Sequence, residues 1–198
     1  MTAKNISSAQ DVYQIKVTLL WTKPPIWRRL LVPSPTTLER LHDVLQTAMG
    51  WQNCHMHEFS LGRRRFGQPD ISGGFMDEPT VESERATRLC DLLQRTGAKM
   101  TYTYDFGDGW EHNIVLEKQL SPDQDTVYPI CLDGRLACPP EDCGGIPGLY
   151  RLLDILANPK HKEHDEMRDW VGGNFDPEAF SVEKVNKLLT PMRRSRKE

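Results

Sequence analysis

The side chains best suited to chemistry lie in one stretch, residues 102–112, where three acids and a histidine are interleaved with aromatic residues. The four polar side chains are Asp105, Asp108, Glu111 and His112. Carboxylates and imidazoles are common ligands of divalent cations, and a bound cation can activate water for hydrolysis. The alternation of residue types predicts two strands folded over a tight turn, so this turn is the first candidate for a functional site.

The register of this hairpin decides which side chains face each other. A three-residue loop, residues 107–109, keeps the aromatic side chains of both strands on one face, whereas a two-residue turn would place threonines opposite apolar residues. With the three-residue loop, Tyr104 pairs with His112, and a core position beside Tyr104 is the simpler interpretation of this histidine. Asp105 then lies opposite Glu111, and two like charges in that position repel each other. An arginine from elsewhere in the fold, a shared proton or a metal should neutralise this pair. Of these alternatives we favour the arginine.

A second stretch, residues 138–145, combines cysteines, prolines and glycines with the acidic pair Glu141 and Asp142. The pair comes just before a predicted helix, where exposed backbone amides stabilise carboxylates, and this capping role is sufficient to explain it. A metal site would require the pair to meet the acids of the first stretch in space. The candidate functional residues from both stretches are Asp105, Asp108, Trp110, Glu111, His112, Glu141 and Asp142.

A divalent metal, zinc or manganese, is the cofactor that these residue types would suit. The candidate ligands are Asp105, Glu111, His112, Cys131, Cys138 and Cys143. The cysteines are separated by six and four residues, which is irregular for a zinc site, and buried free cysteine is the default interpretation. The segment Cys54-His55-Met56-His57 could also chelate a metal, although a strand with His57 turned inward is the commoner explanation.

The candidate phosphate-contacting residues are arginines in two clusters, Arg28 with Arg29 and Arg63 with Arg64 and Arg65. Phosphate contacts from such side chains would position a nucleic acid. For the second cluster we favour an exposed hairpin tip.

The chain has 198 residues and a formal net charge of −3, which argues against a protein that coats nucleic acid. No apolar run approaches the roughly 20 residues of a membrane helix, and the N-terminus lacks the apolar core of a signal peptide. The five cysteines are an odd number, and with no secretory signal we expect reduced thiols. We therefore expect a cytoplasmic protein without a membrane segment.

Apolar periodicity predicts strands and helices in a mixed order along the chain. We expect strands over residues 13–21, 26–32, 54–61 and 129–135 besides the central hairpin, which ends near residue 120. We expect helices over residues 36–49, 87–95, 147–156, 162–171 and 181–189, the first begun by a capping box of Thr36 with Glu39. Residues 67–85 read as a long excursion and a candidate mobile loop.

The class is α+β, a mainly antiparallel sheet built from hairpins with helices packed on one face. We expect a loose segment over residues 1–10, a single domain over residues 11–190 and a basic tail over residues 191–198.

Several sequence blocks, among them the two stretches discussed above, make the chain resemble the plasmid pRiA4b ORF-3-like family over about residues 13–189. The resemblance implies a single α+β domain found in bacteria and archaea, often encoded near plasmid or transposon genes, and it brings no established reaction. It rests on the blocks Pro25-Ile26-Trp27-Arg28-Arg29, Met49-Gly50-Trp51, His57-Glu58-Phe59, Tyr104-Asp105-Phe106-Gly107-Asp108-Gly109-Trp110-Glu111-His112 and Pro139-Pro140-Glu141-Asp142-Cys143-Gly144-Gly145.

Two hypotheses for function follow. The one we prefer from the sequence is a non-enzymatic binding module associated with mobile genetic elements, with a nucleic acid or another protein as its partner. Its supports are the arginine clusters, the aromatic residues of the turn and the family context. The alternative is a metal-dependent hydrolase that uses Asp105, Asp108, Glu111 and His112 together with Glu141 and Asp142. It requires at least three of these side chains to converge within ligand distance.

Overall fold

The computed structural model describes residues 11–68, 81–173 and 175–194. Within these ranges the strands form one sheet in the order β5-β4-β3-β6-β7-β1-β2-β8. The strands are β1 (Val12–Leu19), β2 (Trp27–Pro33), β3 (His57–Leu61), β4 (Arg64–Gly67), β5 (Val81–Ser83), β6 (Lys99–Tyr104), β7 (Trp110–Leu120) and β8 (Ile130–Arg135). The helices are α1 (Leu38–Met49), α2 (Leu89–Leu92), α3 (Gly145–Leu156), α4 (His164–Trp170) and α5 (Val182–Arg194).

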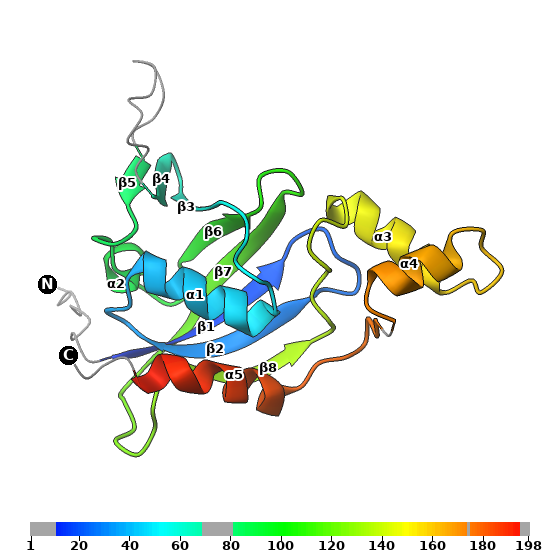
Figure 1. Ribbon diagram of the computed structural model, residues 1–198. Helices are drawn as coiled ribbons and strands as arrows, with labels where there is room; N and C mark the ends of the chain where they lie inside the picture. Colours follow the sequence, from blue (N-terminus) through cyan, green and yellow to red (C-terminus); the bar gives the residue numbers. More distant parts are fainter. Residues whose placement is uncertain (1–10, 69–80, 174, 195–198) are drawn as a thin grey trace, which may run out of the picture.

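The sheet is antiparallel except for the parallel pair of β4 and β5. Helices α1 and α5 lie side by side over one face of it, and α3 packs with α4 beyond its end (Figure 1). This arrangement confirms the predicted α+β class. The core lies between the sheet and its helices, because alternate strand residues point inward and are apolar or aromatic. Its largest fully buried side chains include Trp110, Tyr13, Tyr102, Tyr104, Phe59 and Phe66.

The first helix begins one residue later than the predicted capping box. Thr37 is the N-cap, and its hydroxyl accepts a hydrogen bond from the backbone N–H of Arg40 at 3.2 Å. The Thr36 hydroxyl instead donates to the carbonyl of Pro33. Either of the two adjacent threonines could cap the helix. Because the Thr36 hydroxyl bonds to Pro33, Thr36 belongs to the preceding turn and Thr37 caps the helix. The helix ends at Gly50, which takes the left-handed conformation with φ +107°.

The central hairpin has the predicted faces but a different register. Tyr102 pairs with His112 and Tyr104 with Trp110, so the predicted three-residue loop is wrong and the turn covers residues 105–109. A slip of two residues leaves each side chain on its predicted face. Glu111 lies opposite Thr103, and the predicted like-charge pair of Asp105 with Glu111 is therefore not formed.

The structure differs from three other expectations. The excursion over residues 67–85 contains β5, while its residues 69–80 lie outside the described part of the chain, as does the segment 1–10. The helix expected over residues 87–95 is a single turn, α2. Helix α5 continues to Arg194, so the first residues of the expected tail are helical.

Candidate functional site

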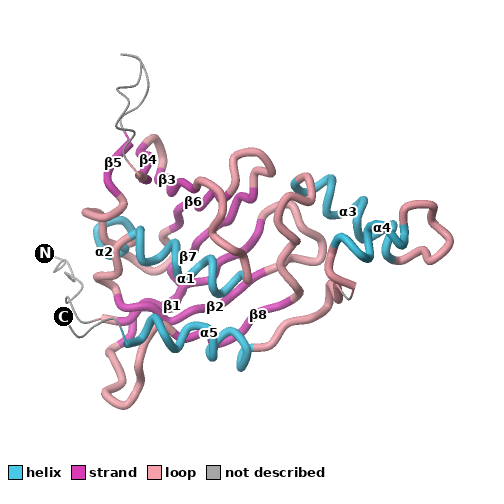
Figure 2. The backbone as a smooth tube through the Cα atoms, viewed as in Figure 1, coloured by secondary structure: helices cyan, strands magenta, loops and turns pink. Residues whose placement is uncertain are grey.

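Three connecting segments meet at one end of the sheet. They are the link from α1 to β3, the turn between β6 and β7, and the link from β8 to α3, which run toward one another in the same region (Figure 2). Hydrogen bonds join them: the N–H of Asp105 donates to the carbonyl of Met56, and the N–H of Gln52 donates to the Glu141 carboxylate. Residues distant in the sequence are thereby held at one place.

His55 lies at the centre of this junction and faces three carboxylates. Its Nε2 atom is 3.2 Å from Asp142 Oδ1, 3.7 Å from Asp105 Oδ2 and 3.8 Å from Glu141 Oε2. Among the described residues, neither this nitrogen nor Glu141 Oε2 has a hydrogen-bond partner, although both atoms are sealed from solvent. The Asp142 oxygen comes close to the nitrogen without hydrogen-bond geometry.

These separations can be compared with those of donor atoms that share a metal ion. With bonds of about 2.0–2.1 Å, neighbouring nitrogen and oxygen ligands lie roughly 3.0–3.4 Å apart. The distance from His55 Nε2 to Asp142 falls in this range, and those to Asp105 and Glu141 exceed it by a few tenths of an ångström. Shielded polar atoms without partners are costly, and a cation between them would satisfy both.

Two overlapping sets of three residues bring one potential ligand atom each to within 4.8 Å of one another. One set is His55, Asp105 and Asp142, and the other is Cys54, His55 and Glu141. Both depend on His55. A mixed set of nitrogen, oxygen and sulfur donors suits a transition-metal ion.

The backbone around these ligands is held in an uncommon conformation. Asn53, Asp105 and Asp142 each have φ +55°, in the left-handed region. The turn at Asp105 is closed by its own groups: its carbonyl accepts from the N–H of Gly109 at 2.7 Å, and its Oδ1 accepts from the N–H of Gly107 at 2.9 Å. Such strain is concentrated at functional sites when the surrounding structure maintains it.

Glu141 is anchored by only one of its oxygens. Oε1 accepts hydrogen bonds from the N–H of Gln52 at 2.8 Å and from the Tyr104 hydroxyl at 3.1 Å. Burial raises the pKa of Tyr104, so this hydroxyl keeps its proton and donates it. It also accepts from the N–H of Cys54 at 3.1 Å. Tyr104 therefore orients two of the potential ligands, and Glu141 Oε2 points toward His55.

A buried network on α1 positions the segment before His55. His42 Nε2 is 2.7 Å from Asn53 Oδ1, and the N–H of Asn53 donates to the side chain of Gln46. Burial, together with the neighbouring ring of His57, lowers the pKa of His42 to about 4. The neutral ring donates through Nε2, so its Nδ1 accepts from the Tyr102 hydroxyl at 2.8 Å.

The junction opens on a cleft of about 720 Å³. His55, Cys54 and Phe106 line it on the side of the junction, while His57 and Glu84 line it further along. His57 Nε2 is 2.7 Å from Glu84 Oε2, and the His57 ring stacks on His42. The cleft thus borders the cluster through His55 and Cys54.

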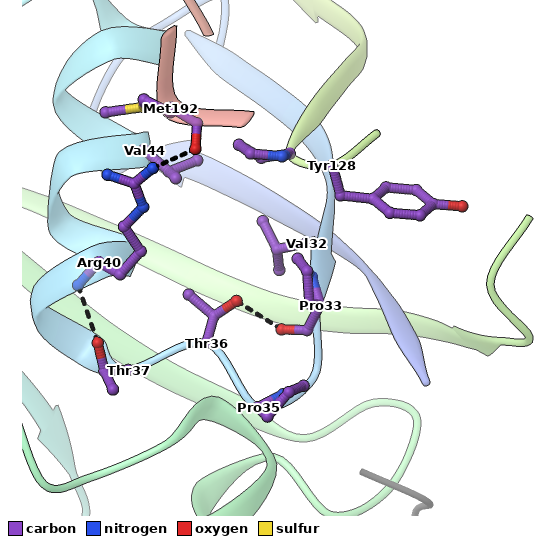
Figure 3. A pocket seen from close by; sticks show the side chains of 10 residues that line it. Val32, Pro33, Pro35, Thr36, Thr37, Arg40, Val44, Tyr128 and Met192 are labelled. Carbon is purple, nitrogen blue, oxygen red and sulfur yellow. Dashed lines mark hydrogen bonds between the residues drawn. The ribbon is translucent and has the colours of Figure 1, made fainter. Parts of the chain in front are cut away.

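A second hollow, of about 340 Å³, lies between β2, the start of α1 and the end of α5 (Figure 3). Its polar groups serve the fold: the Arg40 guanidinium donates to the carbonyl of Met192, and the Thr36 hydroxyl donates to Pro33. The groups of potential metal ligands found in the described ranges lie at the other site.

Of the candidate functional residues, the structure brings Asp105, Glu141 and Asp142 together. Asp108 is nearby but bonds to the backbone, since its Oδ2 accepts from the N–H of Gly144 at 3.1 Å. The other three do not join the cluster. Trp110 and His112 are fully buried in the core, and Glu111 is exposed on β7.

His55 is the residue that the sequence reasoning assigned to another role. Its neighbours predicted a strand from residue 54, but β3 begins at His57, and His55 stays in the connecting segment. The sequence signal that could have identified His55 as a potential ligand was the adjacent Cys54 and the spacing of His55 and His57. The three cysteines of the metal hypothesis, Cys131, Cys138 and Cys143, join neither set of potential ligands in the described ranges.

The first arginine cluster serves the fold. Arg28 is 2% exposed, and its guanidinium donates to the carbonyls of Ala48, Trp27, Arg135 and Leu136 at 2.8–3.0 Å. Arg29 makes two hydrogen bonds to the Glu117 carboxylate, at 2.7 and 3.1 Å. The donors of both residues are therefore already engaged.

In the second cluster, Arg64 pairs with Glu82 and Arg65 with Glu58. Arg63 is exposed at the tip between β3 and β4. Ion pairs therefore compensate two of the three charges in this cluster of candidate phosphate contacts.

Comparison with known proteins identifies the family of this chain. The plasmid pRiA4b ORF-3-like protein family matches residues 11–184. The chain belongs to this family. The uncharacterized protein y4hQ of Sinorhizobium fredii is 42% identical over 181 residues, which cover 90% of this chain and 91% of that protein. The fold of this chain is also similar to a solved structure, the protein of unknown function MM3350 from Methanosarcina mazei Go1. The two share 34% identity and a TM-score of 0.80, over 90% of this chain and 98% of the other.

None of the helices in the described part of this family member combines the length and the apolar character needed to cross a lipid bilayer.

Proposed function

We propose that the protein is a metal-dependent hydrolase whose divalent ion is held by His55, Asp105 and Asp142. The observation that supports this most is the pair of shielded atoms without partners, His55 Nε2 and Glu141 Oε2, which face each other at 3.8 Å. Asp105 and Asp142 approach the same nitrogen. A cation held by His55, Asp105 and Asp142 would give this nitrogen a partner.

The shape of the site favours catalysis over a structural metal. Structural zinc sites are closed by four protein ligands, whereas catalytic sites keep an open position for water. The Asp142 side chain is 71% exposed, so the ion would be reached from solvent on that side. A bound ion lowers the pKa of its water to near neutral. Glu141 Oε2 would accept the proton of this water, because its other oxygen is already held by Gln52 and Tyr104.

The alternative of a non-enzymatic module that binds nucleic acid or another protein and is associated with mobile elements has less support. Nucleic-acid affinity depends on cationic side chains that neutralise phosphates. Arg28 is buried, and Arg29, Arg64 and Arg65 are paired with carboxylates. The hydrolase proposal, in contrast, has a cluster of potential ligands and a cleft.

The proposal keeps the expected cytoplasmic location. All five cysteines are free, which is compatible with a reducing compartment.

The first test is elemental analysis of the purified, untagged protein, with a melting curve before and after chelation. We expect one equivalent of zinc or manganese per chain, and a lower melting temperature after its removal. A panel of ester, amide and phosphodiester substrates would then be assayed with the metal-loaded protein. His55→Ala should lose both metal and turnover, whereas the control Asp133→Asn, on β8, should keep both. A protein that neither contains nor takes up a divalent ion would refute the proposal.

A further inference from the structure

The two sets of potential ligands differ in chemical character. His55, Asp105 and Asp142 offer nitrogen and oxygen, whereas the other set, Cys54, His55 and Glu141, adds a sulfur. Both sets contain His55, and an imidazole nitrogen has a single lone pair to offer an ion. The sets therefore describe two ways of binding one ion rather than two ions.

Sulfur changes which ion such a site prefers. Thiolates select soft and borderline ions such as zinc, while carboxylates suit manganese and magnesium. We propose that Cys54 is a ligand of the ion at His55 and makes the site retain zinc in preference to manganese. This inference rests on the metal site of the proposed function and adds the identity of the ion; in this second way of binding, Cys54 and Glu141 would replace Asp105 and Asp142 as ligands beside His55.

Cys54 is held in place for this role by the same tyrosine that orients Glu141. Its backbone N–H donates to the Tyr104 hydroxyl at 3.1 Å, and its Sγ lies 3.8 Å from that oxygen. The hydroxyl donates in turn to Glu141 Oε1. Metal ligands are commonly fixed by such outer hydrogen bonds, and here one group fixes two members of the sulfur-containing set.

Cys54 also differs from the other thiols in its exposure. It is exposed and lines the cleft, so an ion can reach it. Cys131 is buried and Cys138 and Cys143 are half-buried, and none of the three belongs to either set of potential ligands in the described ranges.

Cobalt(II) provides a direct test, because a cobalt–thiolate bond produces a charge-transfer absorption that nitrogen and oxygen ligands do not. The full-length, metal-free protein would be titrated with cobalt(II), and zinc and manganese affinities would be measured by competition. The variants are Cys54→Ser and the control Cys90→Ser, which removes a partly buried thiol outside both ligand sets. Melting curves of the metal-free variants would verify that each is folded.

We expect the absorption in the wild type and in Cys90→Ser, and its loss in Cys54→Ser. Zinc affinity of Cys54→Ser should fall by about tenfold or more, since even outer-shell partners contribute that much, while manganese affinity changes little. Cobalt binding without the absorption, or unchanged zinc affinity in Cys54→Ser, would overturn this inference and leave the proposed hydrolase site intact. A wild type that binds none of the three ions would overturn both.

Discussion

The carboxylate of Asp108 ties the turn between β6 and β7 to the segment before α3, because its Oδ2 accepts a hydrogen bond from the N–H of Gly144 at 3.1 Å. The backbone of the same residue lies against Gly145, where an added Cβ would be 2.5 Å from the Asp108 carbonyl oxygen. These two contacts set the position of Asp105 relative to Glu141 and Asp142. The candidate site therefore depends on residues that would not touch the ion.

Removing the Asp108 carboxylate should loosen the site without unfolding the protein. In Asp108→Ala we expect zinc affinity, measured by calorimetric titration, to fall by roughly 10–100-fold, the range for outer-shell partners. The free energy of unfolding of the metal-free protein should fall by about 1 kcal/mol, as for a typical lost hydrogen bond. Asp123→Ala is the matched control, because Asp123 also accepts from a backbone N–H, that of Asp125. Equal zinc affinity in the two variants would contradict the prediction.

Substituting Gly145 would test the close approach between this residue and the backbone of Asp108. It has φ +66° and no room for a Cβ, whereas Gly172 has φ +83° and nothing within 4 Å of the added atom. Each alanine substitution should cost about 1–2 kcal/mol for the left-handed backbone. Only Gly145→Ala should also push the turn and the ligand segment apart and weaken zinc binding. Urea unfolding and zinc titration of both variants would separate these effects, and similar results for the two would mean that the contact is unimportant.

The fold was largely predictable because its signals are local. Alternation in β1 and helical spacing in α1 are periodic patterns that survive in the structure. The hairpin shows the limit of this reasoning. Its apolar faces were predicted, but its register was displaced because the turn is closed by the side chain of Asp105, which accepts from Gly107. This bond, together with the one from the N–H of Gly109 to the Asp105 carbonyl, favours the longer turn over a shorter loop.

The candidate site was only half predictable. Asp105, Glu141 and Asp142 were singled out by their turns, which are local features. Their meeting point, His55, depends on three connecting segments that converge in space, and sequence spacing contains no information on that distance. The surroundings of Arg28 were unpredictable for a related reason: Arg28 lies within a strand pattern, and only the folded chain shows its four carbonyl partners.

Arg28 should be far more important for stability than its neighbour. Lysine at this position cannot reach the four carbonyl groups that the guanidinium fork bonds, and buried carbonyls left without partners are costly. We expect Arg28→Lys to lower the free energy of unfolding by on the order of 3 kcal/mol. Arg29→Lys, whose partner Glu117 is partly exposed, should cost less than about 1 kcal/mol. Urea unfolding at pH 7 would compare them, and a phosphate-contacting role for Arg28 would instead predict little change in stability.

His112 should make the fold sensitive to mild acid. Burial lowers the pKa of His112 from its ordinary value of about 6.5 to about 4. Between these values the ring is neutral in the folded protein and protonated in the unfolded chain, so the unfolded state binds more protons. The free energy of unfolding must then decrease as the pH falls from 6.5 toward 4. Between pH 7 and pH 5 this residue alone should lower the free energy of unfolding by about 2 kcal/mol.

The measurement is urea unfolding of the metal-free wild type and His112→Phe at both pH values. Phenylalanine keeps an aromatic ring beside Trp51, which His112 contacts edge-on, and removes the titrating group. We expect the loss of stability on acidification to be smaller in the variant by that amount. Some loss should persist, because the pKa of His42 is lowered to about 4 in the same way. If the two proteins lose equal stability between pH 7 and pH 5, His112 does not titrate differently in the folded and unfolded states.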